Sequence, residues 1–128
     1  MSDKKRIMVV DDDPDIVDSV KSFLEKEGFA VDTAYDGKEG LEKIRANPPD
    51  AIVLDVMMPE MDGYQVCEVL KGDDALSEIP VVLLTAVASH VTTTQYTHAD
   101  GLNVEADDYL PKPVTAEQIV NAVKDLLE

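Results

Sequence analysis

The chain has 128 residues, of which 27 are acidic and 11 are Lys or Arg, giving a formal net charge of −16. This length predicts a single domain with a sizeable core, and the acidity argues against partners such as nucleic acid or anionic membranes, which attract basic patches. The single cysteine, Cys67, excludes an internal disulfide and suits a reducing compartment. Only four apolar residues follow Arg6, too few for a signal peptide, and no run approaches a membrane span, so we expect a cytoplasmic protein.

The chain begins with a predicted strand, helix and second strand. Residues 7–10 are apolar without alternation, which is typical of a strand covered on both faces. Asp13 is a predicted N-cap before Pro14, and the apolar stripe of the following helix ends at Gly28. Residues 29–34 alternate between apolar and polar types, as expected of an edge strand.

The middle of the chain predicts a second helix, a third strand and a third helix. Asp36 and Asp62 are each followed three residues later by Glu or Gln, the capping-box pattern of a helix start. Between these helices, residues 51–54 form another purely apolar run, which ends at Asp55. An ionised carboxylate at the interior end of a strand is costly unless another group pairs with it. Cys67 falls within the third helix as a small buried hydrophobe.

The C-terminal part predicts two more strands and a last helix. Residues 81–84 are a fourth apolar strand that ends at Thr85, and residues 109–110 are a short fifth strand before Lys112. Thr115, followed three residues later by Gln, is a predicted cap of the last helix.

Strand and helix alternate about five times, which predicts an α/β fold. We expect residues 1–128 to form one doubly wound domain with a parallel sheet and right-handed crossovers. Ligands bind outside the carboxyl ends of the strands in such sheets. This rule brings together the polar residues that end four strands: Asp11, Asp12, Asp13, Asp55, Thr85 and Lys112.

The residue types at this edge predict a cation site next to phosphoryl chemistry. Clustered carboxylates repel one another, and a divalent cation removes that conflict. Ligands that are all oxygen favour Mg²⁺ or Ca²⁺ over Zn²⁺. Lys112 adds positive charge and Thr85 adds a hydroxyl donor, which suits a phosphoryl group with an Asp as nucleophile. The alternative is purely structural, with Lys112 in a salt bridge to Asp55 and Thr85 capping a helix.

The chain resembles the receiver domains of two-component response regulators, phosphoacceptor modules related to the chemotaxis receiver. The resemblance covers nearly the whole chain and rests on the motifs at residues 9–12, 54–59, 62–63, 84–86 and 112–113. It implies a flavodoxin-like (βα)5 sandwich whose five parallel strands have the order 2-1-3-4-5.

The resemblance implies a phosphoryl site that contains Mg²⁺. Asp55 would accept the phosphoryl group, and Asp11, Asp12 and Asp55 would hold the cofactor Mg²⁺ together with the backbone carbonyl of Met57. Asp13 would remain a helix cap rather than a metal ligand.

The same resemblance implies roles for three residues on the last two strands. Thr85 would donate a hydrogen bond to the phosphoryl group, and Lys112 would pair with its charge. Tyr109 would turn inward as a switch when Thr85 moves. The Lys112–Pro113 peptide would be cis, which is uncommon in folded proteins.

The implied function is that of a signalling phosphoacceptor, not an enzyme, which assists only its own phosphorylation and dephosphorylation. Its partners would be a sensor histidine kinase or a phosphotransfer protein. A downstream protein or a second copy would bind the face formed by the fourth helix, the fifth strand and the last helix. Two alternatives are a pseudo-receiver that lacks the chemistry and a nucleotide- or flavin-binding protein. The intact set of Asp11, Asp12, Asp55, Thr85 and Lys112 argues against the first. The missing Gly-rich phosphate loop after the first strand argues against the second.

Two features depart from the family pattern. Met57 and Val87 are apolar, so they cannot orient a water molecule by hydrogen bonding, and we expect slow loss of the phosphoryl group. The segment 86–107 is long and rich in β-branched residues, which disfavour a helix. It is expected to form either a short helix from near Ser89 with a solvated loop or a segment that orders on phosphorylation.

Overall fold

Parallel strands form the centre of the molecule in the computed structural model, which describes residues 4–58, 62–85, 106–112 and 114–127. Within these residues the element order is β1 (Arg6–Val10), α1 (Pro14–Lys26), β2 (Ala30–Ala34), α2 (Gly37–Ala46), β3 (Ala51–Asp55), α3 (Gly63–Lys71), β4 (Val81–Thr85), β5 (Asp108–Pro111) and α5 (Ala116–Leu127). The five strands are all parallel and have the order β2-β1-β3-β4-β5. The predicted fold class and strand order are confirmed.

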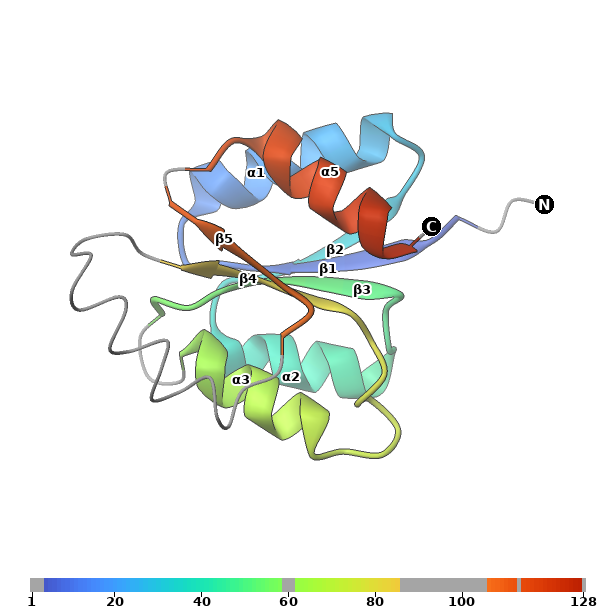
Figure 1. The fold of residues 1–128 in the computed structure, drawn as a ribbon, viewed down its shortest axis with the longest axis vertical. Helices are drawn as coiled ribbons and strands as arrows, with labels where there is room; N and C mark the ends of the chain where they lie inside the picture. Colours follow the sequence, from blue (N-terminus) through green and yellow to red (C-terminus); the bar gives the residue numbers. More distant parts are fainter. Residues whose placement is uncertain (1–3, 59–61, 86–105, 113, 128) are drawn as a thin grey trace.

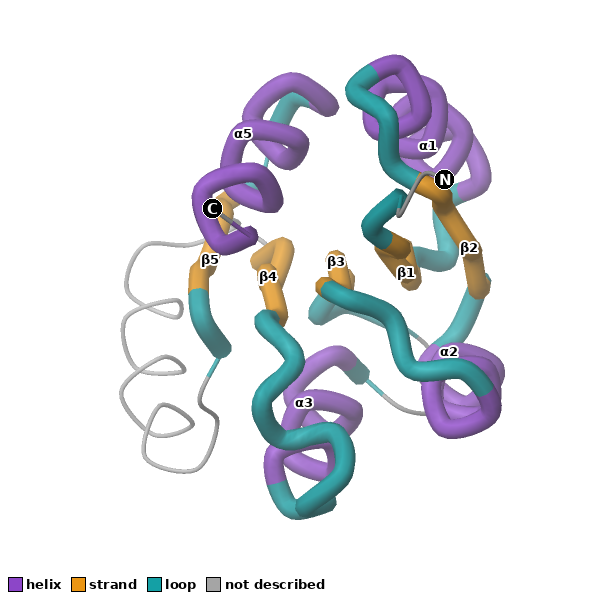
Figure 2. Tube along the Cα trace, turned by 90° about the vertical axis from the view of Figure 1, so that its right-hand side faces the viewer, coloured by secondary structure: helices purple, strands orange, loops and turns teal. Residues whose placement is uncertain are grey.

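The described helices cover the sheet on both faces. Helices α1 and α5 lie on one face, and α2 and α3 lie on the other (Figures 1 and 2). Side chains from alternate positions of each strand therefore enter two separate cores. Met8 and Leu54 belong to the core under α2 and α3, whereas Val9 and Val53 belong to the core under α1 and α5. This burial on both faces explains why the central strands are apolar without alternation.

Local capping defines most helix starts as predicted. The side chain of Asp13 accepts a hydrogen bond from the Asp15 N–H, and Asp62 forms the predicted capping box with Gln65. Thr115 and Gln118 exchange the same pair of bonds before α5. The sequence signals at these starts are therefore confirmed.

The α2 start corrects the prediction in one detail. The Asp36 side chain accepts from the Glu39 N–H at 2.8 Å, as predicted. However, the Glu39 carboxylate accepts from the N–H of Tyr35 at 2.9 Å, whereas in a capping box it would accept from the N–H of the N-cap residue Asp36. The second bond of the capping box is therefore shifted by one residue. The N-cap bond itself is unaffected.

Other predictions are confirmed or lie outside the described residues. Cys67 is fully buried in α3, and β2 is an edge strand. Gly28 has a φ of 94°, the left-handed conformation that favours glycine after a helix. The segment 86–105 falls outside the described residues, so the predicted alternatives for it remain predictions. Among the described helices, none has the length and apolar character needed to cross a membrane.

Candidate functional site

The candidate site lies where four adjacent strands end. Asp11 follows β1, Asp55 closes β3, Thr85 closes β4, and Lys112 follows β5 directly. The register places Val10 beside Leu54, Asp55 beside Leu84, and Thr85 beside Pro111. The carboxyl ends of these strands therefore meet at one edge of the sheet, as the sequence predicted.

Three carboxylates meet at this edge. Asp11, Asp12 and Asp55 each offer an oxygen atom, and these atoms all lie within 4.8 Å of one another. Asp11 and Asp55 are buried, with exposed fractions of 0% and 1%, whereas Asp12 is exposed. Asp13 is also exposed, and its side chain caps α1 by accepting from the Asp15 N–H, as the sequence predicted.

One carboxylate oxygen in this cluster has no hydrogen-bond partner. The Oδ1 atom of Asp11 accepts from the Asp13 N–H at 3.0 Å, but its buried Oδ2 atom has no hydrogen bond within the described residues. A buried unpaired carboxylate oxygen is unfavourable, and a cation between these acids would satisfy it. The donor set is entirely oxygen and partly open to solvent, which fits Mg²⁺ with some of its water ligands retained.

Lys112 supplies the positive charge of the site. Its Nζ atom lies 2.8 Å from Asp55 Oδ1 and 3.9 Å from Asp11 Oδ2. Burial by itself would lower the pKa of Lys112, but the hydrogen bond and charge of Asp55 outweigh burial and raise it. Lys112 therefore stays charged at neutral pH and holds the Asp55 carboxylate in place.

Asp11 binds a proton more readily than an ordinary carboxyl group. Burial raises its pKa to about 7, and the nearby negative charge of Asp55 acts in the same direction. The hydrogen bond from Asp13 and the charge of Lys112 oppose this rise without cancelling it. Lys112 therefore offsets the burial of Asp11 only in part.

The loop after Asp55 is held close to that residue by α3. The N–H of Met57 approaches Asp55 Oδ1 at 3.4 Å, and the N–H of Gly63 donates to the Val56 carbonyl at 3.0 Å. A Cβ atom on Gly63 would lie 2.8 Å from the Cα atom of Val56 and would also collide with the Asp55 carbonyl oxygen. The sequence motif contained Gly63, but this close backbone approach could not be predicted from it.

The remaining predicted residues are placed as follows. The carbonyl of Thr85 accepts from the N–H of Lys112 at 2.7 Å, which joins the ends of β4 and β5. Tyr109 is 38% exposed and Met57 is 60% exposed. Val87 and the Lys112–Pro113 peptide fall outside the described residues.

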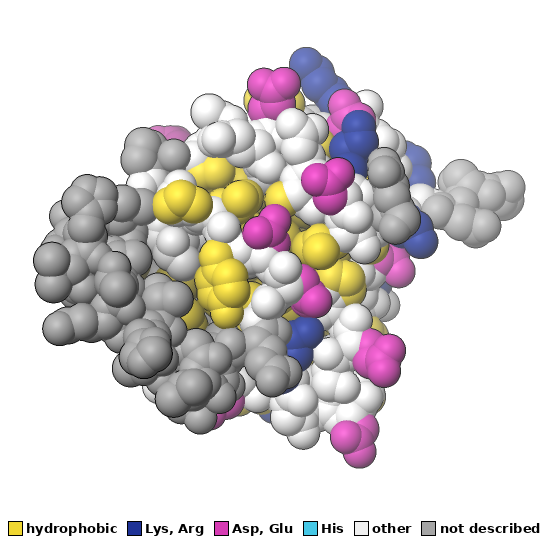
Figure 3. Space-filling model, in the orientation of Figure 1, with side chains coloured by type: hydrophobic (Ala, Val, Ile, Leu, Met, Phe, Trp, Pro, Cys, Tyr) yellow, Lys and Arg dark blue, Asp and Glu magenta, His cyan; other side chains and the backbone are white. Residues whose placement is uncertain are grey.

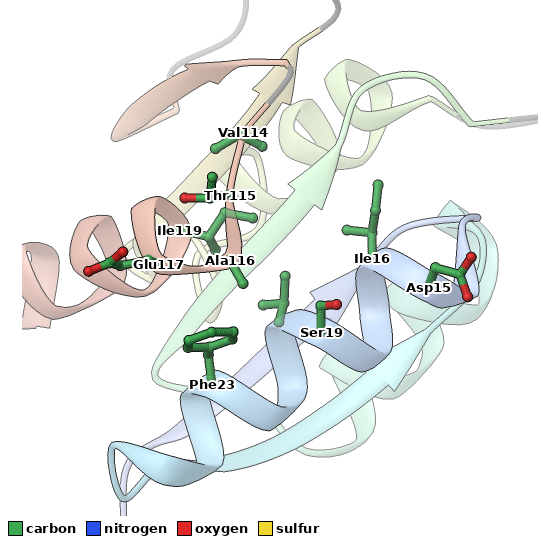
Figure 4. Close-up of a pocket in the computed structure, with 10 residues that line it drawn as sticks. Asp15, Ile16, Ser19, Phe23, Val114, Thr115, Ala116, Glu117 and Ile119 are labelled. Carbon is green, nitrogen blue, oxygen red and sulfur yellow. The ribbon is translucent and has the colours of Figure 1, made fainter.

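The structure also contains a groove that the sequence did not predict. It has a volume of about 420 Å³ and lies between α1 and the start of α5 (Figure 4). Its lining residues are Asp15, Ile16, Ser19, Val20, Phe23, Val114, Thr115, Ala116, Glu117 and Ile119. We call these residues the α1–α5 groove. Two of its residues, Asp15 and Val114, follow the site residues Asp12 and Lys112 closely in the chain.

Comparison with known proteins gives consistent results across sequence and structure. Residues 7–124 match the family described as response regulator receiver domain. Response regulator MprA of Mycobacterium tuberculosis H37Rv is 42% identical over 125 residues, which are 95% of this chain and 50% of that protein. The chain thus spans about half the length of the curated relatives it matches.

Two solved structures show the same likeness. The signal receiver domain of a signal transduction histidine kinase from Syntrophus aciditrophicus has a TM-score of 0.85 and 35% identity, covering 96% of this chain and 89% of that one. A CheY-like response regulator receiver domain protein from Methanospirillum hungatei has a TM-score of 0.80 and 32% identity, covering 98% and 94%.

Proposed function

This chain belongs to the response regulator receiver domain family, and from that membership we propose that Asp55 accepts a phosphoryl group from the phosphohistidine of a partner protein. The partner is a sensor histidine kinase or a phosphotransfer protein. The domain signals through this modification and turns over no substrate besides its own phosphoryl group.

The observation that carries the proposal is the environment of Asp55. Its carboxylate is buried, lies 2.8 Å from the Lys112 ammonium group, and shares a cluster of oxygens with Asp11 and Asp12. A carboxylate that serves as a nucleophile must be fixed in orientation, and the ion pair with Lys112 fixes Asp55. In the structural alternative, a plain salt bridge between Lys112 and Asp55, the Asp11 Oδ2 atom still has no hydrogen bond among the described residues.

The residues of the site support the transfer in the following way. One Asp55 oxygen attacks phosphorus as the bond from phosphorus to the imidazole nitrogen of the partner breaks, and an acyl phosphate forms. Mg²⁺, held by Asp11, Asp12, Asp55 and the carbonyl of Met57, would neutralise the negative charge of the carboxylates and the phosphoryl oxygens. Lys112 then pairs with a phosphoryl oxygen instead of with Asp55 alone.

The response to phosphorylation is proposed to pass through β4 and β5. The Thr85 hydroxyl would donate to a phosphoryl oxygen, and Tyr109, which is 38% exposed here, would move inward as Thr85 shifts. Two conformations of unequal phosphate affinity are sufficient for such a switch. The face containing β5 and α5 would then bind a downstream protein or a second copy.

The α1–α5 groove is proposed to receive a helix of the phosphohistidine protein. Its lining is apolar at Ile16 and Phe23 on α1 and at Ile119 on α5, and Asp15 and Glu117 add negative charge (Figure 4). Apolar anchors flanked by acids suit an amphipathic helix with basic residues at its edges. A helix in this position would lie beside Asp55 and could present its histidine there.

Mass measurement after incubation with acetyl phosphate and Mg²⁺ tests the proposal. We expect one added phosphoryl group that is lost in base, and we expect Asp55→Asn to add none. Asp74→Asn, which neutralises an exposed acid on the α3–β4 connection, is the matched control and should be labelled like the parent. Undiminished labelling of Asp55→Asn would show that the phosphoacceptor lies elsewhere.

A further inference from the structure

A second polar cluster joins β4 to β5 at the end of the sheet opposite the site. Asp107 Oδ2 accepts from the Val81 N–H at 2.8 Å, and the Asp107 N–H donates to the Val81 carbonyl at 2.9 Å. Both backbone polar groups of Val81 are thus bonded to one residue. The carboxylate takes the position that a further ladder bond would occupy, and β5 begins at the next residue.

Lys71 connects this cluster to α3. Its Nζ atom lies 3.4 Å from Asp107 Oδ2 and also donates to the carbonyls of Ser77 at 3.1 Å and Ile79 at 3.2 Å. The Lys71 side chain is 19% exposed, so these bonds are partly shielded from water. As the last residue of α3, Lys71 ties that helix to the connection before β4 and to the start of β5.

Besides the ladder to β4 and the partly buried Leu110, strand β5 has few contacts that specify its register. It is a four-residue edge strand with no fully buried residue. A short edge strand with weak burial is prone to slip, and a slip of one residue turns every side chain to the other face. Asp108 follows Asp107 directly, so a slipped strand would bring a second carboxylate to Val81.

Lys112 depends on this register. It follows β5 by one residue, and its N–H donates to the Thr85 carbonyl at 2.7 Å. Five residues of extended chain, about 17 Å, separate it from Asp107. A displaced β5 would therefore carry the ammonium group away from Asp55, although Asp107 is remote from the chemistry.

We propose that Lys71 and Asp107 are positioning residues that fix the register of β5 and thereby hold Lys112 at Asp55. The functional part of this inference rests on the proposed phosphoacceptor role of Asp55, while the register itself can be measured independently.

Amide hydrogen exchange and phosphorylation rates test the proposal on the same variants. In Asp107→Ala, which loses the charge-assisted hydrogen bond from the Val81 N–H, we expect the Lys112 amide to exchange about tenfold faster. We also expect phosphorylation by acetyl phosphate to slow several-fold. Lys71→Met should show the same pattern more weakly. Glu27→Ala is the matched control, because Glu27 forms an ion pair of 2.9 Å with Lys124 and is similarly exposed (43% against 40% for Asp107). It should change neither quantity.

Two further variants separate positioning from general destabilisation. Asp107→Asn retains an oxygen for the Val81 N–H, so we expect it to restore much of the protection at Lys112 and to remain folded if the alanine variant does not. In a Lys112→Ala background, Asp107→Ala should cause no additional loss of phosphorylation rate, because the residue through which it acts is gone.

Each result decides the proposal. Unchanged exchange at Lys112 in both Asp107 variants would overturn the register role. An equal additional rate loss in the Lys112→Ala background would show that Asp107 does not act through Lys112. If the parent takes up no phosphate, the proposed function fails, whereas the exchange data still decide whether Asp107 fixes β5.

Discussion

At the scale of single residues, Asp11 sets the electrostatic behaviour of the site. Its pKa of about 7 follows first from burial and then from the charge of Asp55. The ordinary value of 3.8 applies in the unfolded chain, so between these two values the folded protein holds a proton that the unfolded chain has released. The contribution of Asp11 to stability without metal is complete below about pH 4 and is lost as the pH rises to about 7.

A pH series with an Asp11→Asn variant tests this assignment. Without metal, we expect the parent to lose stability from about pH 4 to about pH 7 relative to the variant, whose amide does not titrate. At pH 8 the variant should be more stable by about 1–3 kcal/mol, because it removes a buried negative charge that lies next to Asp55. Urea unfolding in the presence of a chelator measures the pH dependence of stability and the stability difference at pH 8. Parallel stability curves for the two proteins would contradict the raised pKa.

At the scale of elements, the start of α3 fixes the loop that carries Met57. Gly63 permits the helix to contact the backbone at Asp55 and Val56, where a Cβ atom has no space. We expect Gly63→Ala to destabilise the fold by about 1–3 kcal/mol, the usual cost of overpacking, and to slow phosphorylation by displacing Asp55. Urea unfolding gives the first quantity and labelling with acetyl phosphate gives the second.

The control for this change is Gly72→Ala at the end of the same helix. Gly72 has a φ of −87°, and an added Cβ would lie 3.3 Å from the Glu68 carbonyl oxygen, a contact that is tight but much longer than those at Gly63. The free energy of unfolding of this variant should lie within about 0.5 kcal/mol of that of the parent, as is usual for surface substitutions. Equal effects of the two substitutions would show that the close contact at Gly63 is not what matters.

The α1–α5 groove gives a prediction that separates docking from chemistry. Phe23 lines the groove and is 44% exposed, so a bound helix could cover it. We expect Phe23→Ala to slow phosphoryl transfer from a phosphohistidine protein about tenfold or more, as for a central aromatic anchor, without changing labelling by acetyl phosphate. Tyr35→Ala removes an aromatic ring of nearly equal exposure, 43%, that does not line the groove, and should affect neither rate. Similar transfer rates for both variants would rule out the groove as the docking site.

The elements also show how far sequence reasoning could reach. The caps at Asp13, Asp62 and Thr115 were predictable because each involves residues within one turn. The site was predictable because a general rule on parallel sheets gathers the strand ends, wherever the helices pack. The α1–α5 groove and the contact between Lys71 and Asp107 could not be predicted from the sequence. Each joins segments that are far apart in the chain and depends on how the helices and strands pack.

At the scale of the whole molecule, the diffuse repulsion from the net charge of −16 and the effect of a cation at the proposed metal site are separate. Among the described residues on the face shown in Figure 3, acidic side chains are scattered and form no single large patch. Monovalent salt screens this diffuse repulsion wherever it occurs. Mg²⁺ at the site would instead act on Asp11, Asp12 and Asp55, and would stabilise the fold by mass action, by about 2.7 kcal/mol at 100 times its Kd.

Thermal unfolding in Mg²⁺ and in NaCl of equal ionic strength distinguishes these effects. We expect NaCl to raise the melting temperature of the parent and of Asp12→Ala by the same amount, because screening does not depend on one exposed acid. Mg²⁺ should raise the melting temperature of the parent further than NaCl does. Asp12→Ala should lose most of that additional increase, because the ion loses a ligand. Asp18→Ala, which removes an exposed acid from the middle of α1, is the matched control and should keep the additional increase. If Mg²⁺ and NaCl act equally on the parent at the same ionic strength, the three carboxylates do not form a specific metal site, and the orphaned oxygen of Asp11 must be satisfied by protonation instead.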